Sequence, residues 1–207
     1  MSATRIIIFA KAPQSGFAKT RLIPALGVME AAALAKEMLI HTLHQALAAN
    51  IGSVELCVTP QIQDKAWQTI TLPTGIVISD QGEGDLGERL SRAAARTVAN
   101  SESVILIGTD CVEMSSKLLR TAAQTLDGHD AVIHATADGG YALLGCTQYC
   151  PLLFSDIPWS TDAVAQMTID RIKQLGWSLH TGEVLRDIDE PQDLEFLPKK
   201  WKVYAEV

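Results

Sequence analysis

The chain has 207 residues, of which 17 are Lys or Arg and 24 are Asp or Glu, so its formal net charge is −7. Because 47% of the residues are hydrophobic and only 20% are charged, the composition excludes an intrinsically disordered chain. The length predicts a single domain spanning residues 1–207. The acidic balance argues against a protein that binds nucleic acid, because such domains are usually basic.

Short β-branched runs alternate with longer segments of helical periodicity along the sequence. The predicted strands cover residues 5–10, 53–59, 75–79, 103–108, 130–135 and 141–145. The predicted helices cover residues 30–49, 86–99, 115–126 and 161–175, and hydroxyl side chains are expected to cap the last two. This alternation predicts an α/β domain with a mostly parallel sheet, in which ligands bind at the carboxyl ends of the strands.

The loop that follows the first predicted strand has the composition of a phosphate-binding loop. Lys11, Lys19 and Arg21 can neutralise a polyphosphate, and Gly16 lets backbone N–H groups approach an anion closely. The loop matches neither the Walker A pattern nor the G-x-G-x-x-G dinucleotide pattern. We therefore expect it to bind nucleotide phosphates, and the alternative is an ordinary solvated basic loop.

Aspartates at the strand ends predict a metal site. Asp110 directly follows the buried strand 103–108, where a carboxylate can hold a divalent cation that also binds substrate phosphates. Asp187 and Asp189 are two residues apart on an extended segment, so their side chains point the same way and repel each other unless a cation or a basic group lies between them. The alternatives are a helix cap for Asp110 and a solvated acidic turn for the other two.

A second glycine-containing turn, Asp138-Gly139-Gly140-Tyr141, lies between two short predicted strands. Asp-Gly-Gly is suited to a tight hairpin, which is the structural interpretation. The functional interpretation is a wall against which a sugar or base packs. Further along, Glu190-Pro191 is expected to open a helix, because Pro is favoured near the first helical position.

Five segments occur in a fixed order: IIIFAKAPQSGFAKTRL, GTDC, DGGYALLG, FSDIPWSTDAV and DIDEPQDL. Over about residues 5–195 this set resembles a bacterial glycosyltransferase-A-like family of unknown function in the nucleotide-diphospho-sugar transferase superfamily. Related members include arsenosugar-type and radical-SAM-associated glycosyltransferases. The AKTRL segment also resembles phospholactate guanylyltransferases, and the aspartate pattern resembles molybdenum-cofactor nucleotidylyltransferases. The resemblance implies a three-layer α/β/α, Rossmann-like fold of the glycosyltransferase-A type.

The resemblance also implies roles for individual residues. The nucleotide base and phosphates would be held by Lys11, Gly16, Lys19 and Arg21. The ligands of a Mg²⁺ or Mn²⁺ cofactor would be Asp110, Asp189 and Asp187. The substrate side would be lined by Asp138, Gly139, Gly140, Tyr141, Trp159, Ser160, Thr161 and Asp162. The residues expected to act in catalysis are Asp110, Lys19 and Asp138.

Two positions depart from the pattern of the resembled family. Relatives usually carry Pro two residues after the first metal-binding aspartate, where this chain has Val112. They often carry Gly-Pro before the Asp-Gly-Gly segment, where this chain has Ala135-Thr136. Because both positions lie beside the predicted site, the substrate of this chain cannot be inferred from the substrates of its relatives.

Three interpretations of function follow. The first is a metal-dependent glycosyltransferase that moves a sugar from a nucleotide-diphospho-sugar to a small-molecule acceptor, with Asp138 or Asp162 as the base. The second is a nucleotidylyltransferase that joins an NTP to a phosphorylated small molecule and releases pyrophosphate, which the lack of an L-A-G-G-type glycine run weakens. The third is a non-catalytic nucleotide-binding module, which the pair Asp110 and Asp189 weakens.

The sequence also bears on compartment and partners. No apolar run approaches the roughly 20 residues that span a bilayer, and the run at 6–10 is too short for a signal peptide. The 4 cysteines include no C-x-x-C pair and are too sparse for a disulfide scaffold. We expect a cytoplasmic protein with no nucleic-acid partner and no membrane span, and nothing indicates a homo-oligomer.

Overall fold

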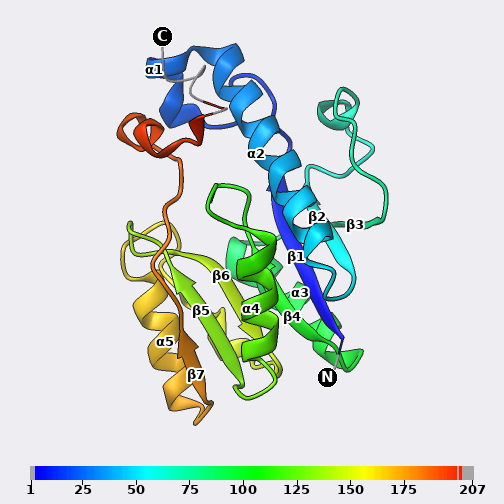
Figure 1. The fold of residues 1–207 in the computed structure, drawn as a ribbon, viewed down its shortest axis with the longest axis vertical. Coiled ribbons are helices and arrows are strands. Elements are labelled where there is room, and N and C mark those ends of the chain that lie inside the picture. Colours follow the sequence, from blue (N-terminus) through cyan, green and yellow to red (C-terminus); the bar gives the residue numbers. More distant parts are fainter. Residues whose placement is uncertain (1–2, 200, 202–207) are drawn as a thin grey trace.

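A seven-stranded sheet runs through the computed structural model, which describes residues 3–199 and 201 (Figure 1). The strands lie in the order β3-β2-β1-β4-β6-β5-β7. Their bounds are β1 (Thr4–Lys11), β2 (Val54–Thr59), β3 (Ile76–Asp80), β4 (Ser103–Ile107), β5 (Ala131–Ala135), β6 (Tyr141–Cys146) and β7 (Leu179–Thr181). Strand β6 pairs antiparallel with β4 and β5, whereas the other pairings are parallel. The predicted mostly parallel sheet is therefore confirmed.

Helices cover both faces of the sheet. The α-helices are α1 (Ile23–Leu26), α2 (Val28–Ala49), α3 (Leu86–Ala99), α4 (Ser116–Thr125) and α5 (Val164–Gln174), and the 3₁₀ helices are η1 (Thr20–Leu22), η2 (Lys65–Trp67), η3 (Pro151–Leu153) and η4 (Pro191–Phe196). Because side chains alternate along β1, Ile6 and Ile8 pack in a core with α2 and α4, and Ile7 packs in a second core with α3 and α5. The fold is thus the expected three-layer α/β/α arrangement.

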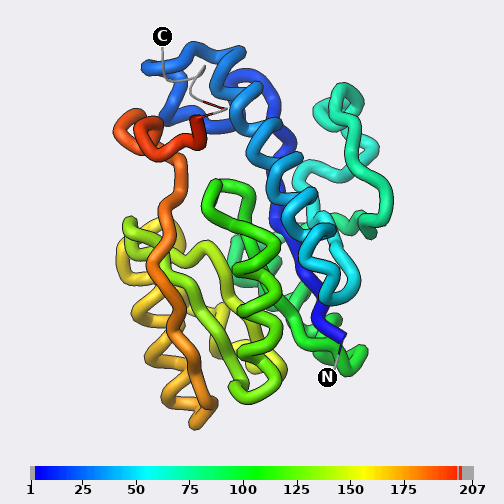
Figure 2. Tube along the Cα trace, in the orientation of Figure 1, coloured from blue at the N-terminus to red at the C-terminus, as the bar shows by residue number. Residues whose placement is uncertain are grey.

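A third apolar cluster joins the segment 22–38 to the C-terminal segment 188–201. After β7 the backbone runs back along the molecule until η4 lies beside α1 and the start of α2 (Figure 2). There Ile188, Leu194 and Trp201 are buried against Leu22 and Leu34. This cluster holds the segment that precedes η4 against the end of the sheet.

Several local predictions agree with the structure. Helix α3 has the predicted bounds, and the Ser115 hydroxyl caps α4 by accepting a hydrogen bond from the Leu118 N–H at 3.2 Å. Pro191 opens a helix as expected, although this helix, η4, is a 3₁₀ helix. Short elements such as β7 and η1 carry too little periodicity to be predicted. Among the residues that the structure describes, no helix is long and apolar enough to cross a bilayer.

The predicted start of the helix at 161–175 is wrong, as is its hydroxyl cap. Helix α5 begins at Val164, and its N-cap residue, Ala163, makes no side-chain cap. Ser160 has φ 66°, in the left-handed region that interrupts a helix, and the Thr161 hydroxyl donates instead to the Pro158 carbonyl at 2.7 Å. The segment before α5 therefore forms turns rather than a first helical turn.

The turns at residues 158–163 pack against the turn between β5 and β6. Gly139 has φ +91°, and a Cβ added there would lie 2.2 Å from the Asp162 carbonyl oxygen. The Ala165 N–H donates to the Gly139 carbonyl at 2.9 Å. Only glycine fits this close backbone approach, which brings the 158–163 turns to the end of the sheet.

We expect Gly139→Ala to lower the free energy of unfolding by about 2 kcal/mol or more, because it adds both a contact with backbone and an unfavourable φ. The matched control is Gly128→Ala, since a Cβ at Gly128 meets nothing within 4 Å. Urea unfolding followed by circular dichroism measures both. Equal urea midpoints for the two variants would show that the close approach of Gly139 to Asp162 does not contribute to stability.

Candidate functional site

Two adjoining cavities, each of about 470 Å³, lie at the carboxyl ends of β1 and β4. One, which we call the cationic cavity, is lined by Lys11, Lys19, Arg21 and Arg89 among others. The other, the acidic cavity, is lined by Asp138, Asp162 and Asp187 and by the rings of Phe9, Tyr141 and Trp159. Arg21, Asp110 and Asp189 line both. The two cavities therefore meet at this cation and these two carboxylates.

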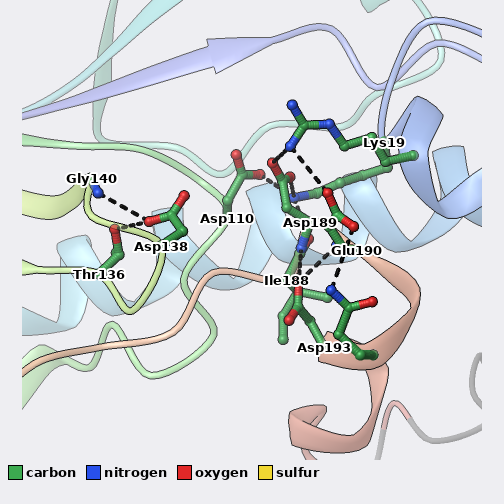
Figure 3. Close-up of polar contacts among 11 residues, drawn as sticks. Lys19, Asp110, Thr136, Asp138, Gly140, Ile188, Asp189, Glu190 and Asp193 are labelled. Carbon is green, nitrogen blue, oxygen red and sulfur yellow. Dashed lines mark hydrogen bonds and ion pairs between the residues drawn. The ribbon is translucent and has the colours of Figure 1, made fainter. Parts of the chain in front are cut away.

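Lys19 occupies the centre of the junction (Figure 3). Its Nζ lies 2.6 Å from Asp110 Oδ1 and 2.9 Å from Asp189 Oδ1, and it donates to the Ile188 carbonyl at 2.6 Å. The side chain is 5% exposed. Burial alone would lower the pKa of Lys19, but the charges of Asp110 and Asp189 outweigh it and raise the pKa, so the ammonium stays protonated.

The two aspartate-bearing segments reach this point by backbone pairing. Asp110 follows β4, and its carbonyl accepts a hydrogen bond from the Ile188 N–H at 2.9 Å. Cys111 forms an antiparallel bridge with Asp187. Because Ile188 is fully buried in the third cluster, the alternating backbone turns Asp187 and Asp189 into the acidic cavity, as their spacing predicts.

The environment of Asp187 disfavours the charged form of its carboxyl group. Burial raises the pKa of Asp187 to about 7, and the charges of Asp110, Asp138 and Asp189 add to this, while Lys19 partly opposes it. The site thus gathers more carboxylates than Lys19 neutralises. Oxygen donors with excess negative charge fit Mg²⁺ or Mn²⁺. Within residues 3–199 and 201, however, no three acidic, His or Cys side chains are already arranged to hold one ion.

The acidic cavity also contains a fixed carboxylate. Asp138 lies in the turn between β5 and β6, where its Oδ1 accepts hydrogen bonds from the Thr136 hydroxyl at 2.5 Å and the Gly140 N–H at 3.1 Å (Figure 3). Nearby, the rings of Tyr141 and Trp159 contact edge to face, with centroids 6.4 Å apart. The Tyr141 hydroxyl is buried with no hydrogen-bond partner among the described residues, and burial raises the pKa of Tyr141. These groups can bind a molecule rich in hydroxyls.

The structure brings most of the predicted site residues to the two cavities, but two glycines line neither. Gly16, with φ +80°, lies in the turn before Phe17, which does line the cationic cavity. Gly139 packs against Asp162, as described above. Sequence reasoning missed Phe17, Gln81 and Arg89. Gln81 directly follows β3, so an inspection of the residue after every predicted strand would have found it.

Solved structures resemble this chain over nearly its whole length. A protein from Desulfovibrio desulfuricans G20 assigned as a nucleotide-diphospho-sugar transferase is 28% identical, with a TM-score of 0.87 over 97% of this chain and 88% of its own. A cytidylyltransferase from Leptospira borgpetersenii is 15% identical, with a TM-score of 0.61 over 100% of this chain and 93% of its own. Rv0371c of Mycobacterium tuberculosis, solved in complex with manganese, is 15% identical, with a TM-score of 0.56 over 94% and 97%.

The two more distant likenesses show the fold alone, whereas the first agrees with the superfamily resemblance seen in the sequence. No protein of curated function matches the sequence. Residues 42–161, more than half of the chain, match a family described as "Uncharacterized protein conserved in bacteria (DUF2064)". The chain therefore belongs to this conserved bacterial family.

Proposed function

We propose that this protein is a glycosyltransferase that takes a sugar from a nucleotide-diphospho-sugar and transfers it to a hydroxyl of a small acceptor. The observation that carries the proposal is the separation of charge between two cavities that meet at Asp110 and Asp189. One cavity suits a diphosphate, and the other suits an uncharged molecule with hydroxyl groups. The likeness to the Desulfovibrio desulfuricans protein supports a transferase of this class.

The nucleotide would bind in the cationic cavity. Lys11, Lys19 and Arg21 supply the positive charge that a diphosphate needs, and Lys19 is fixed in place before the ligand arrives. Preorganised cations stabilise the negative charge that develops on a leaving diphosphate, because they need not reorganise during the reaction.

Mg²⁺ or Mn²⁺ fits the donor set of the junction, with Asp110, Asp189 and Asp187 as the residues that would hold it. When bound, the ion would neutralise diphosphate oxygens and so make the nucleoside diphosphate a better leaving group. These carboxylates would position the ion, and Lys19 keeps Asp110 and Asp189 close together.

Charge also favours glycosyl over nucleotidyl transfer. The acidic cavity is lined by Asp110, Asp138, Asp162, Asp187 and Asp189, with Arg21 and the Lys19 ammonium as the opposing cations. A phosphorylated substrate, which the nucleotidyl reaction requires, would meet no surplus of positive charge there, because the carboxylates outnumber these cations and a bound divalent ion only brings the cavity close to neutral. A sugar instead gains hydrogen bonds from the carboxylates and packs against the ring of Trp159.

Asp138 is the better placed of the two candidate bases. Its Oδ1 is held by Thr136 and Gly140, which leaves Oδ2 to accept a proton, whereas among the residues that the structure describes no side-chain hydrogen bond fixes the Asp162 carboxylate. In the proposed step Asp138 takes the proton of the acceptor hydroxyl as that oxygen bonds to the anomeric carbon of the sugar. The bond from this carbon to the diphosphate breaks, and its electron pair leaves with the nucleoside diphosphate beside Lys19 and Arg21.

The remaining expectations from the sequence are part of the same proposal. We expect the chain to act as one domain in the cytoplasm on a small-molecule acceptor. Nucleotidyl transfer and a non-catalytic module are outcomes that the experiments below distinguish.

We predict that Asp110→Ala removes the effect of metal on nucleotide binding. Calorimetry with a nucleoside diphosphate in Mn²⁺ and in EDTA gives the ratio of the two dissociation constants. We expect this ratio to be about tenfold or more in the wild type and close to one in the variant. The ratio is insensitive to the direct contact between Lys19 and phosphate. Asp127→Ala, on an exposed turn after α4, is the control, and a metal effect that survives in Asp110→Ala would contradict the assignment.

We predict that Asp138→Asn slows sugar transfer by about 10²- to 10⁴-fold without weakening nucleotide binding. The assay follows release of nucleoside diphosphate from a panel of nucleotide-sugars, with simple sugars and polyols as acceptors. Pyrophosphate release from NTP and a phosphorylated acceptor would instead identify a nucleotidylyltransferase. Binding of nucleotides without turnover of any donor would identify the non-catalytic module.

A further inference from the structure

Arg89 brings an unpaired, buried hydrogen-bond donor to the cationic cavity. The residue lies in the first turns of α3, whose start is fixed by a capping box between Asp85 and Glu88. Its Nη1 donates to Gln81 Oε1 at 3.2 Å, but its Nε is buried and has no hydrogen-bond partner among the described residues. Leaving a buried donor unpaired costs free energy, so its presence in a cavity points to a ligand that supplies the acceptor.

Gln81 fixes the orientation of this guanidinium. Gln81 is 8% exposed, and its Nε2 donates to the carbonyls of Ala10 at 3.2 Å and Cys57 at 3.1 Å. Both amide hydrogens are therefore used by the ends of β1 and β2. Its Oε1 is left to accept from Arg89, while the Gln81 carbonyl accepts from Arg92 at 2.7 Å. Gln81 acts as a positioning residue for Arg89, and its contact with Nη1 leaves Nε of this cavity-lining residue without a partner among the described residues.

The unpaired edge of the Arg89 guanidinium carries two parallel hydrogen-bond donors, an arrangement that we call a two-donor fork. Because Nη1 is used by Gln81, the N–H groups of Nε and Nη2 remain as two parallel donors on one side of the guanidinium. Such a fork binds a pair of adjacent acceptor atoms. Carboxylates, phosphates and the acceptor edges of some nucleobases all present such a pair.

The position of Arg89 in the cavity favours the base over the phosphates. The hydrogen bonds of Gln81 place this residue, which holds Arg89, at the ends of β1 and β2, whereas Asp110 follows β4 on the other side of β1. Because neighbouring strands are about 4.8 Å apart, Gln81 and Asp110 are separated by about one to two strand spacings, a distance that a ribose can span. The wall of the same cavity includes the apolar side chains of Phe9, Phe17 and Leu86. A planar base fits this environment better than a phosphate.

We propose that Arg89, held by Gln81, determines which base the protein accepts by binding two adjacent acceptor atoms on its edge. Guanine presents such a pair as O6 and N7, and cytosine presents one as O2 and N3. Adenine offers N7 beside an amino donor, and uracil separates its two carbonyls with an N–H. Guanine and cytosine nucleotides are therefore the selected class. This inference rests on the proposed function, because it requires that a nucleotide occupies the cationic cavity.

Calorimetry with GDP, CDP, ADP and UDP, in Mn²⁺, tests the inference on the full chain. We expect GDP or CDP to bind at least about tenfold more tightly than both ADP and UDP. Whichever of the two binds more tightly identifies the base. Arg89→Lys keeps the positive charge but has no two-donor edge, so it should reduce this preference to about one. Gln81→Met should also weaken the preference, because it releases the guanidinium.

Two further measurements separate the possible failures. Arg120→Lys alters an arginine on α4 that donates to the Ala48 carbonyl, so it controls for replacing any arginine and should keep the preference. Pyrophosphate affinity should be unchanged in Arg89→Lys, and its loss would show that Arg89 binds phosphate and overturn the inference. If nucleotides bind without base preference, the inference about Arg89 is overturned but the proposed function is not. If no nucleotide binds, both the inference and the proposed function are overturned.

Discussion

One buried ammonium group holds the candidate site together. Lys19 Nζ contacts Asp110 after β4, and Asp189 and the Ile188 carbonyl in the C-terminal segment, so it links residues about 170 positions apart in the chain. Without this charge the carboxylates at the end of the sheet would repel one another. The backbone of Lys19 has φ 47°, a left-handed conformation that non-glycine residues adopt at an energetic cost. The contacts of the ammonium offset that cost.

The same ammonium determines how a ligand can enter. An ammonium has three N–H groups, and in Lys19 they face Asp110, Asp189 and the Ile188 carbonyl. A diphosphate oxygen that binds Lys19 must therefore replace one of these acceptors, and the carboxylate it displaces then needs another positive charge. In the proposed function a divalent ion supplies that charge. Under that proposal the binding of metal and the binding of nucleotide are coupled through one side chain, even though each contacts different atoms of the site.

The sequence predicts those parts of the structure that depend on local periodicity. The apolar run 5–10 indicates a strand covered on both faces, and the two-residue spacing of Asp187 and Asp189 places both in one cavity. What it does not predict depends on contacts between distant segments. The turn at Ser160 forms where the segment that contains Asp162 packs against Gly139, and Gln81 is held in the cationic cavity by the carbonyls of two other strands. Neither contact leaves a periodic signal along the chain.

The departures from the family pattern gain a physical meaning from these contacts. Thr136 stands where relatives often have proline, and its hydroxyl holds Asp138 Oδ1, a bond that proline could not make. Val112 is partly buried against the cluster that contains Ile188, so an apolar side chain there supports the segment that carries Asp187 and Asp189. Both substitutions thus position aspartates of the acidic cavity. Under the proposed function, Thr136 therefore acts on the candidate base and Val112 on the segment that carries the candidate metal ligands, whereas neither residue lines the cationic cavity.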